Sequence, residues 1–354
     1  MRTKHLVAAL LVAVVSLGAL PAAAAPLQIP APPREGGLAV PSAPNVSAPA
    51  WVVYDADADL VLGEQAADER RAMASTTKMM TALIVLKYGT LTDWIIVSER
   101  AAAVGEAEVG LVPGERVRLD ELLTALVVRS ANDAAMAAAE HIGGSVEGFV
   151  EMMNAEAQEM GLTNTSFENP HGLDGENHYS SARDLLEIGL AAMAYPEFRE
   201  RAVMLKGPFP DAPDGTERTL SSTNLMLETY PGTIGVKTGF TGKAGLVFVA
   251  GAEREGRTLF AAVMGSEGQR AHFVDAASLL DWGFERFRTV AMVGAGTYEP
   301  PEPVRLVEEA PEPEPEPEPK PVVETLVRAP DGELPHLAGA FAWVSRLFEW
   351  TDGG

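Results

Sequence analysis

The chain has 354 residues, contains no cysteine and carries a formal net charge of −23. The lack of cysteine excludes disulfide bonds, thiolate nucleophiles and cysteine-ligated metal sites in this chain, and the excess of acidic residues argues against nucleic-acid binding. About 240 residues between Trp51 and Phe287 are enough for a sizeable hydrophobic core, as one domain or as two closely packed lobes.

The N-terminal residues indicate an exported protein. Arg2 and Lys4 precede an apolar stretch from Leu6 to Leu20, and a run of alanines follows. This arrangement is typical of a secretory signal peptide, and the stretch is shorter than the ~20 residues that a membrane-spanning helix needs. We expect a signal peptide at residues 1–24, a Pro/Ala-rich linker at 25–49, and a protein that works in the periplasm or cell envelope. An uncleaved N-terminal anchor is the alternative.

The next segment, "AWVVYDADADLVLGEQ", predicts two short strands around an acidic turn. Three aspartates alternate within residues 55–59 and imitate the start of a calcium-binding loop. The sixth position of that loop is Leu60 where glycine is needed, and its twelfth is Ala66 where a glutamate ligand is needed. The sequence therefore favours a hairpin turn over a calcium site.

Hydrophobic periodicity predicts the regular elements of the central region. Apolar residues with helical spacing occur over residues 74–87, 119–142, 146–160 and 182–194. Further on, "AGLVFVAGA" and "TLFAAVMGS" flank "EREGR" and predict a hairpin of two buried strands, and "ASLLDWGFERF" predicts an amphipathic helix. Strand, helices and strands again in this order favour an α+β fold with one antiparallel sheet, and we place the domain at residues 50–290.

The C-terminal region differs in composition from this domain. The string "PEPEPEPEPKP" predicts a stiff, extended linker at residues 291–334. Residues 335–354 carry apolar side chains along one broad face of a helix. This segment is too short to span a bilayer but long enough to lie in a membrane interface. A membrane tether and a helix that packs on the domain or a partner are the two alternatives.

Ser75 and Lys78 lie one helical turn apart inside the apolar run "MASTTKMMTAL". Residues three apart share a helix face, and a serine hydroxyl needs a base within hydrogen-bonding reach before it can attack a carbonyl. Burial disfavours the ammonium and lowers the pKa of a lysine, which makes it a usable base. Ser75 and Lys78 are therefore a candidate nucleophile and base; a helix start with a snorkelling lysine is the alternative.

Two further motifs carry polar residues where the surrounding pattern is apolar. Ser130 and Asn132 interrupt a helical pattern, where a second hydroxyl could relay a proton to a leaving amine and an amide could hold Lys78 and a substrate carbonyl. The run 237–239, Lys-Thr-Gly, follows a strand-like stretch. A cation and a hydroxyl suit a substrate carboxylate there, and Gly239 leaves room for a substrate to lie along the strand. A helix–helix turn and a Gly-rich surface turn are the alternatives.

In the order Ser-x-x-Lys, Ser-x-Asn, Lys-Thr-Gly, these motifs form the set of penicillin-recognising serine enzymes. The chain resembles the low-molecular-mass D-alanyl-D-alanine carboxypeptidases from about residue 50 to 287, including "STTKMMTA", "SANDAA", "HYSSARDL" and "WGFERF". The resemblance implies a β-lactamase/DD-peptidase-like fold, in which helices flank an antiparallel sheet and a mainly helical lobe is inserted. It also implies that no cofactor or metal is used.

The family resemblance implies an activity and a set of catalytic residues. Members remove the terminal D-alanine from peptidoglycan stem peptides by way of an acyl-serine, and β-lactams inhibit them by acylating the same serine. Matched onto this chain, Ser75 would be the nucleophile, Lys78 its base and Ser130 the residue that shuttles the proton.

The same match implies the substrate-binding residues. Asn132 would position the substrate, and Lys237 and Thr238 would bind its terminal carboxylate. The backbone N–H groups of Ser75 and Phe240 would form the oxyanion hole, and Arg270 would add to carboxylate recognition.

Four alternative functions remain at this point. A DD-endopeptidase would use the same site. A class A β-lactamase would need a loop glutamate with an asparagine four residues on, and Glu168 has Gly172 there, although Glu176 lies nearby. A non-catalytic scaffold would have lost a motif residue, and none is lost. A zinc peptidase would need clustered ligands, which the histidines at 141, 171, 178 and 272 do not form in the sequence.

Overall fold

A computed structural model describes residues 42–294 of the chain. The predicted signal peptide, most of both predicted linkers and the predicted C-terminal segment lie outside these residues. The described region is built on one five-stranded antiparallel sheet with strand order β2-β1-β9-β8-β7. The strands are β1 (Ala50–Asp55), β2 (Leu60–Gln65), β7 (Thr233–Thr241), β8 (Gly245–Arg254) and β9 (Arg257–Ser266).

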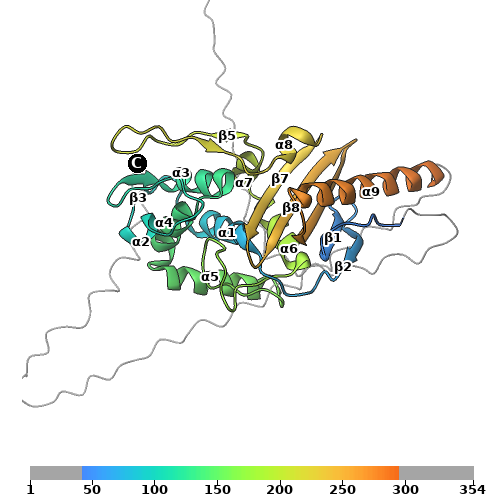
Figure 1. Ribbon diagram of the computed structural model, residues 1–354, viewed down its shortest axis with the longest axis horizontal. Coiled ribbons are helices and arrows are strands. Elements are labelled where there is room, and N and C mark those ends of the chain that lie inside the picture. The colour runs from blue at the N-terminus through green and yellow to red at the C-terminus, as the bar shows by residue number, and fades with distance from the viewer. Residues whose placement is uncertain (1–41, 295–354) are drawn as a thin grey trace, which may run out of the picture. The chain divides into compact units, whose positions relative to one another are not determined.

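Helices cover both faces of this sheet. The long helix α9 (Ala271–Gly294) lies along one face beside β8 and β9, as Figure 1 shows. On the other face, α6 (Ala182–Met193) packs against β1 and β9, and α1 (Lys78–Tyr88) packs against α6. Because both faces are covered, the three central strands β1, β8 and β9 carry continuous apolar runs rather than alternating apolar and polar residues.

Alternate residues of the central strands β1, β8 and β9 enter two different cores. In β1, Val52 belongs to the larger core under α1 and α6, while Trp51 and Val53 belong to the core under α9. Successive side chains of a strand point to opposite faces, so the apolar runs in the sequence supply both cores at once. Trp51 meets Trp282 of α9 edge-on, with ring centroids 6.5 Å apart. The predicted α+β arrangement and the buried β8–β9 hairpin are confirmed.

A mainly helical lobe is inserted between β2 and β7, as the resemblance predicts. Figure 1 shows its helices to one side of the sheet. It contains α2 (Glu99–Ala102), α3 (Leu119–Thr124), α4 (Asn132–Gly143), α5 (Val146–Glu159) and the two-stranded ribbon of β3 (Trp94–Ile96) and β4 (Arg116–Arg118). Smaller elements follow in the chain before β7: α7 (Pro196–Ala202), β5 (Lys206–Gly207), β6 (Leu220–Ser221) and α8 (Met226–Thr229). No helix within residues 42–294 is long and apolar enough to cross a membrane.

The helical pattern over residues 119–142 is broken in the structure at residues 130–132, the polar triplet that interrupts it in the sequence. After α3 the backbone widens into a π-helical turn (Ala125–Arg129), and Ser130 then adopts a left-handed conformation with φ of 64° before α4 begins. The Asn132 N–H donates to the carbonyl of Ala107 at 2.6 Å instead of continuing the helix. A left-handed conformation is uncommon for a residue with a side chain, and the polar triplet 130–132 marks the position of the break.

The acidic turn joins β1 to β2, as the hairpin prediction requires. The Asp55 carboxylate accepts the N–H groups of Asp57 and Ala58 and pairs with Arg257. This carboxylate is thus engaged in holding the turn and bracing β9. Within residues 42–294, no three histidine, aspartate or glutamate side chains gather as a metal site would require.

Candidate active site

Ser75 lies at the start of a helix, on the turn that leads into α1. Residues Ala74–Thr77 form one 3₁₀ turn, and α1 begins at Lys78. Ala74 takes a left-handed φ of 49°, and the hydroxyl of Thr77 donates to the Ala74 carbonyl at 2.8 Å. The first N–H groups of a helix have no intrahelical partner. The Ser75 N–H therefore belongs to a positively polarised end that suits a developing oxyanion.

Lys78 is completely buried one turn after Ser75, with a side chain that is 0% exposed. Its Nζ lies 3.0 Å from Ser75 Oγ, 2.7 Å from Asn132 Oδ1 and 2.5 Å from the His171 carbonyl oxygen. Burial lowers the pKa of Lys78 well below its ordinary value, and the neighbouring cation of Lys237 lowers it further. An amine whose charged form is disfavoured by burial, and that lies within hydrogen-bonding distance of a serine hydroxyl, is the arrangement that a general base needs.

Asn132 joins this pair to the helical lobe. While its Oδ1 holds Lys78, its Nδ2 donates to the Gly105 carbonyl at 3.0 Å, so the amide is fixed from both ends. Ser130 is buried two residues earlier, at the break before α4. The left-handed backbone of Ser130 is the kind of strained conformation that concentrates at functional sites.

The third motif lies in the edge strand β7. Lys237 is 2% exposed, and its Nζ donates to the carbonyl of Thr238 at 3.0 Å. Burial lowers the pKa of Lys237 to about 7. The Thr238 hydroxyl shares a hydrogen bond of 2.6 Å with the hydroxyl of Thr223. Strand β7 has β8 on one side and is an edge of the sheet on the other, so an extended peptide could pair with it.

Gly239 brings β7 directly against the Ser75 turn. A Cβ at this glycine would lie 2.9 Å from the Ser75 backbone nitrogen and 3.0 Å from the Ala74 Cβ. Only glycine allows this approach. The backbone of β7 and the Ser75 N–H are therefore side by side, with Phe240 following at 66% exposure.

The structure unites most of the predicted site residues. Hydrogen bonds join Ser75, Lys78 and Asn132 directly, and the Gly239 backbone meets the Ser75 turn. Arg270 stands apart. It is exposed between β9 and α9, and no hydrogen bond or ion pair within residues 42–294 joins its side chain to the other site residues. The roles given to all these residues remain predictions.

The sequence did not reveal two further contacts, which hold Lys78 and the turn that carries Ser75. The His171 carbonyl accepts from Lys78. His178 is buried, and its Nδ1 accepts the Glu168 N–H at 3.0 Å, which leaves its Nε2 to donate to Thr77 Oγ1 at 2.8 Å. Burial lowers the pKa of His178 to about 4, so the ring is neutral near pH 7. Residue type alone gave no sign of the contact between Lys78 and the His171 carbonyl.

Comparisons with known proteins agree with this geometry. The family profile described as D-alanyl-D-alanine carboxypeptidase matches residues 38–268. The D-alanyl-D-alanine carboxypeptidase DacF of Bacillus subtilis is 36% identical over 246 residues, which cover 67% of this chain and 62% of that protein. DacA of Escherichia coli K12 is 34% identical over 281 residues, covering 75% of this chain and 68% of that one.

Solved structures show the same fold. The D-alanyl-D-alanine carboxypeptidase of Mycobacterium tuberculosis H37Rv aligns with a TM-score of 0.66 at 34% identity, covering 70% of this chain and 94% of that one. The Streptomyces K15 DD-transpeptidase aligns with a TM-score of 0.66 at 31% identity, covering 69% of this chain and 99% of that one. The predicted β-lactamase/DD-peptidase-like fold is thus confirmed, and the chain belongs to the D-alanyl-D-alanine carboxypeptidase family.

Proposed function

We propose that this protein is a serine-type D-Ala-D-Ala carboxypeptidase that removes the terminal D-alanine from peptidoglycan stem peptides, with Ser75 as its nucleophile. The observation that carries the proposal is the Lys78 side chain. It is completely buried, it forms no ion pair within residues 42–294, and its Nζ lies 3.0 Å from Ser75 Oγ. Membership of the family supports the same activity.

The geometry supports a specific acylation step. Neutral Lys78 takes the proton of Ser75 Oγ while that oxygen attacks the carbonyl carbon of the penultimate D-alanine. The carbonyl oxygen becomes an oxyanion, which the N–H groups of Ser75 and Phe240 stabilise. Since a Cβ at Gly239 would lie only 2.9 Å from the Ser75 nitrogen, β7 passes close enough to supply the second donor.

The intermediate then collapses to the acyl-enzyme. The C–N bond breaks, the leaving D-alanine takes a proton relayed through the Ser130 hydroxyl, and water later hydrolyses the ester on Ser75. The terminal carboxylate of the substrate is bound by Lys237 and Thr238, which line the edge strand. Asn132, held by Gly105 and Lys78, positions the substrate amide. Arg270 is a weaker candidate for carboxylate binding because its side chain joins none of these residues.

β-Lactams are expected to acylate Ser75 and to leave slowly. A fast β-lactamase would need a second base that activates the hydrolytic water. Glu168, the loop glutamate considered for this role, is exposed, and its carboxylate accepts a hydrogen bond from Asn177 at 3.3 Å. No hydrogen bond or ion pair within residues 42–294 joins this carboxylate to Ser75 or Lys78.

Product analysis tests the proposed activity. A stem pentapeptide that ends in D-Ala-D-Ala should release one D-alanine, whereas the matched tetrapeptide should release none and Ser75→Ala should be inactive with both. Cleavage of a cross-linked peptide dimer without release of D-alanine from the pentapeptide would show an endopeptidase instead. No turnover of either substrate by the wild-type protein would overturn the proposal.

We also propose that the protein acts in the periplasm or cell envelope and that residues 335–354 tether it to the membrane surface. The support is the sequence pattern alone, a signal-like N-terminus and an amphipathic C-terminal segment. Both lie outside the described residues. A chain truncated after Thr289 should lose sedimentation with membranes while the full chain keeps it. Equal sedimentation of the two would contradict the tether.

A further inference from the structure

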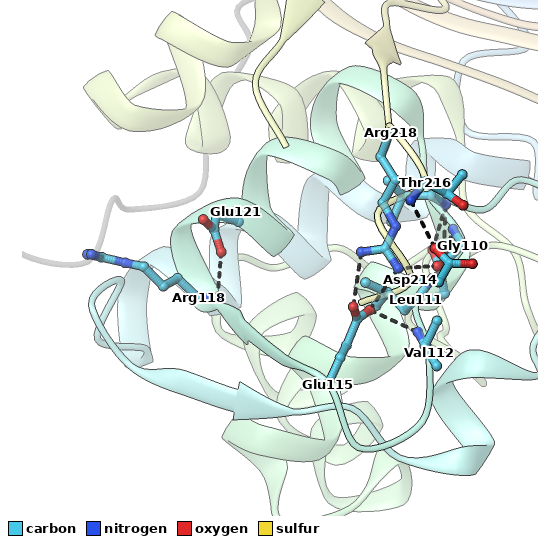
Figure 2. Close-up of polar contacts among 11 residues, drawn as sticks. Gly110, Leu111, Val112, Glu115, Arg118, Glu121, Asp214, Thr216 and Arg218 are labelled. Carbon is cyan, nitrogen blue, oxygen red and sulfur yellow. Dashed lines mark hydrogen bonds and ion pairs between the residues drawn. The ribbon is translucent and has the colours of Figure 1, made fainter. Parts of the chain in front are cut away.

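A buried ion pair joins two loops beside the candidate active site. The side chains of Arg218 and Glu115 are 5% and 6% exposed, and their two hydrogen bonds measure 3.0 and 3.1 Å. Figure 2 shows the pair, with Arg218 reaching from the segment between β5 and β6 toward the loop that precedes β4. The guanidinium also donates to the Gly110 carbonyl, and it lies 5.7 Å from the ring centroid of Phe209.

Such a pair is a poor way to gain stability alone. Removing two charges from water costs several kcal/mol per ion, and apolar residues of similar volume often serve as well. Bidentate arginine–carboxylate pairing instead fixes geometry, because two parallel bonds define both distance and orientation. The position of this pair therefore raises the question of which groups it holds in place.

On one side, the pair orders the loop 105–115. Glu115 accepts the Val112 N–H at 2.8 Å while it pairs with Arg218. Gly110 is held twice, since Arg218 bonds its carbonyl and its N–H donates to Asp133 Oδ2 at 2.9 Å. The N–H groups of residues 109 and 111 also donate to the Asp133 carboxylate. The loop is thus clamped between Arg218 and Asp133.

The same loop contacts Asn132 through two of its backbone carbonyls. The carbonyl of Gly105 accepts from Asn132 Nδ2, and the carbonyl of Ala107 accepts from its backbone N–H. Asn132 Oδ1 in turn lies 2.7 Å from Lys78 Nζ. A path of hydrogen bonds and loop backbone therefore leads from Arg218 through residues 105–110 and Asn132 to the candidate base.

Arg218 is also close in sequence to a segment that contacts the Lys-Thr-Gly strand β7. It lies two residues before β6, and Thr223, just after β6, bonds to the Thr238 hydroxyl at 2.6 Å. The Arg218–Glu115 pair therefore connects the loop 105–115, which holds Asn132, to the segment that contacts the Lys-Thr-Gly strand.

We infer that Arg218 and Glu115 are positioning residues. They orient Asn132 toward Lys78, and they fix the loop 105–115 relative to the segment 218–223 that contacts strand β7. The inference rests on the proposed function of Ser75 and Lys78. It predicts that breaking the pair slows acylation of Ser75 well beyond what any change in stability explains, although neither residue contacts Ser75 or Lys78.

Two variants separate positioning from stability. Arg218→Met keeps an unbranched apolar side chain beside Phe209 but leaves the Glu115 carboxylate buried without its cation, so both stability and acylation should fall. The double variant Arg218→Met/Glu115→Gln removes that unpaired charge and keeps an oxygen for the Val112 N–H. It should recover most of the melting temperature while its acylation remains slow.

A matched control is Arg183→Met. Arg183 also makes three side-chain hydrogen bonds, all to the carboxylates of Asp68 and Glu64, on α6 and away from the loop 105–115. Arg218→Lys is the conservative variant, and it should retain only part of the acylation rate because a point charge cannot hold Glu115 bidentately and Gly110 together.

The experiment measures the second-order rate constant for acylation by benzylpenicillin, together with the melting temperature and amide hydrogen exchange of residues 109–111. We expect the double variant to lose at least 10-fold in rate with faster exchange at these amides, and Arg183→Met to lose less than 2-fold. Recovery of the acylation rate together with the melting temperature would overturn the inference. A wild-type protein that forms no adduct would overturn the proposed function itself, and the inference with it.

Discussion

Lys78 and Lys237 are both buried lysines of the candidate site, but their surroundings differ. The Nζ of Lys78 has three oxygen neighbours, at 3.0 Å from Ser75, 2.7 Å from Asn132 and 2.5 Å from the His171 carbonyl. The Nζ of Lys237 has one such neighbour among the described residues, the Thr238 carbonyl at 3.0 Å. Burial lowers the pKa of both amines.

Burial and hydrogen-bonding partners have separate effects on the two amines. Burial makes each amine easier to deprotonate, but the partners decide its use. Lys78 is held by uncharged acceptors that direct it at a hydroxyl, which suits a base. Lys237 has one acceptor among the described residues and keeps donors to spare, which suits an incoming carboxylate, and a bound anion would restore its positive charge.

The largest effect is expected for Lys78→Met. Without its base, Ser75 is a poor nucleophile, and general-base catalysis typically contributes 10²–10⁴-fold. We therefore expect acylation by benzylpenicillin to slow by about 10³-fold. The control is Lys87→Met on the same helix, whose partly exposed amine pairs with the buried carboxylate of Glu156, and which should leave the acylation rate unchanged even where it lowers the melting temperature. A Lys78→Met variant with near wild-type acylation would remove the role of Lys78 as the base.

Lys237→Met should act on binding rather than on the nucleophile. Hydrogen bonds to a charged group contribute about 1.5–3 kcal/mol, so kcat/KM for a peptide with a free terminal carboxylate should fall by roughly 10- to 100-fold. A neutral ester substrate without that carboxylate should react at the wild-type rate. Equal losses with both substrates would show that Lys237 serves the chemical step, and the contrast with Lys78 would fail.

The two lysines should also produce the two opposite limbs in the pH profile of kcat/KM. Below its own pKa, Lys78 is protonated and cannot accept the Ser75 proton, so kcat/KM should rise with pH on the acid side. Above the pKa of about 7 for Lys237 in the free enzyme, the cation that binds the carboxylate is lost, so kcat/KM should fall on the alkaline side. In Lys237→Met the alkaline limb should disappear and the acid limb should remain. Persistence of both limbs would assign the alkaline limb to another group.

A smaller effect is expected where β7 meets the Ser75 turn. In Gly239→Ala the new Cβ would lie 2.9 Å from the Ser75 nitrogen, so strand and turn must separate by a few tenths of an ångström. We expect a loss of about 10-fold in acylation, since small misplacements of an oxyanion donor are costly. Gly242→Ala is the matched control, because nothing lies within 4 Å of its Cβ position. Similar rates in the two variants would place the oxyanion site elsewhere.

Local periodicity explains what could be predicted from the sequence. The β8–β9 hairpin and the helix after Ser75 follow from apolar patterns a few residues long, and the spacing of Ser75 and Lys78 places both on one helix face. The burial of Lys78 follows from the apolar residues around it. Each of these features depends on neighbours in the sequence.

The remaining features depend on contacts between distant segments. The break at Ser130 is stabilised by the Ala107 carbonyl, and the third acceptor of Lys78 is a backbone carbonyl at His171. A backbone carbonyl has no residue type, so no pattern could reveal it. The close approach of Gly239 to Ser75 likewise requires the sheet and the helical lobe to be assembled first.

The most direct test of the account is the intact mass of the protein mixed with benzylpenicillin and sampled from seconds to hours. We predict one long-lived adduct that maps to Ser75, is absent in Ser75→Ala and forms far more slowly in Lys78→Met. An adduct on another residue, or one that persists in Ser75→Ala, would contradict it. Consumption of penicillin without an accumulating adduct would instead show a β-lactamase, and an intact drug with an unmodified protein would leave the Ser75–Lys78 pair without a catalytic role.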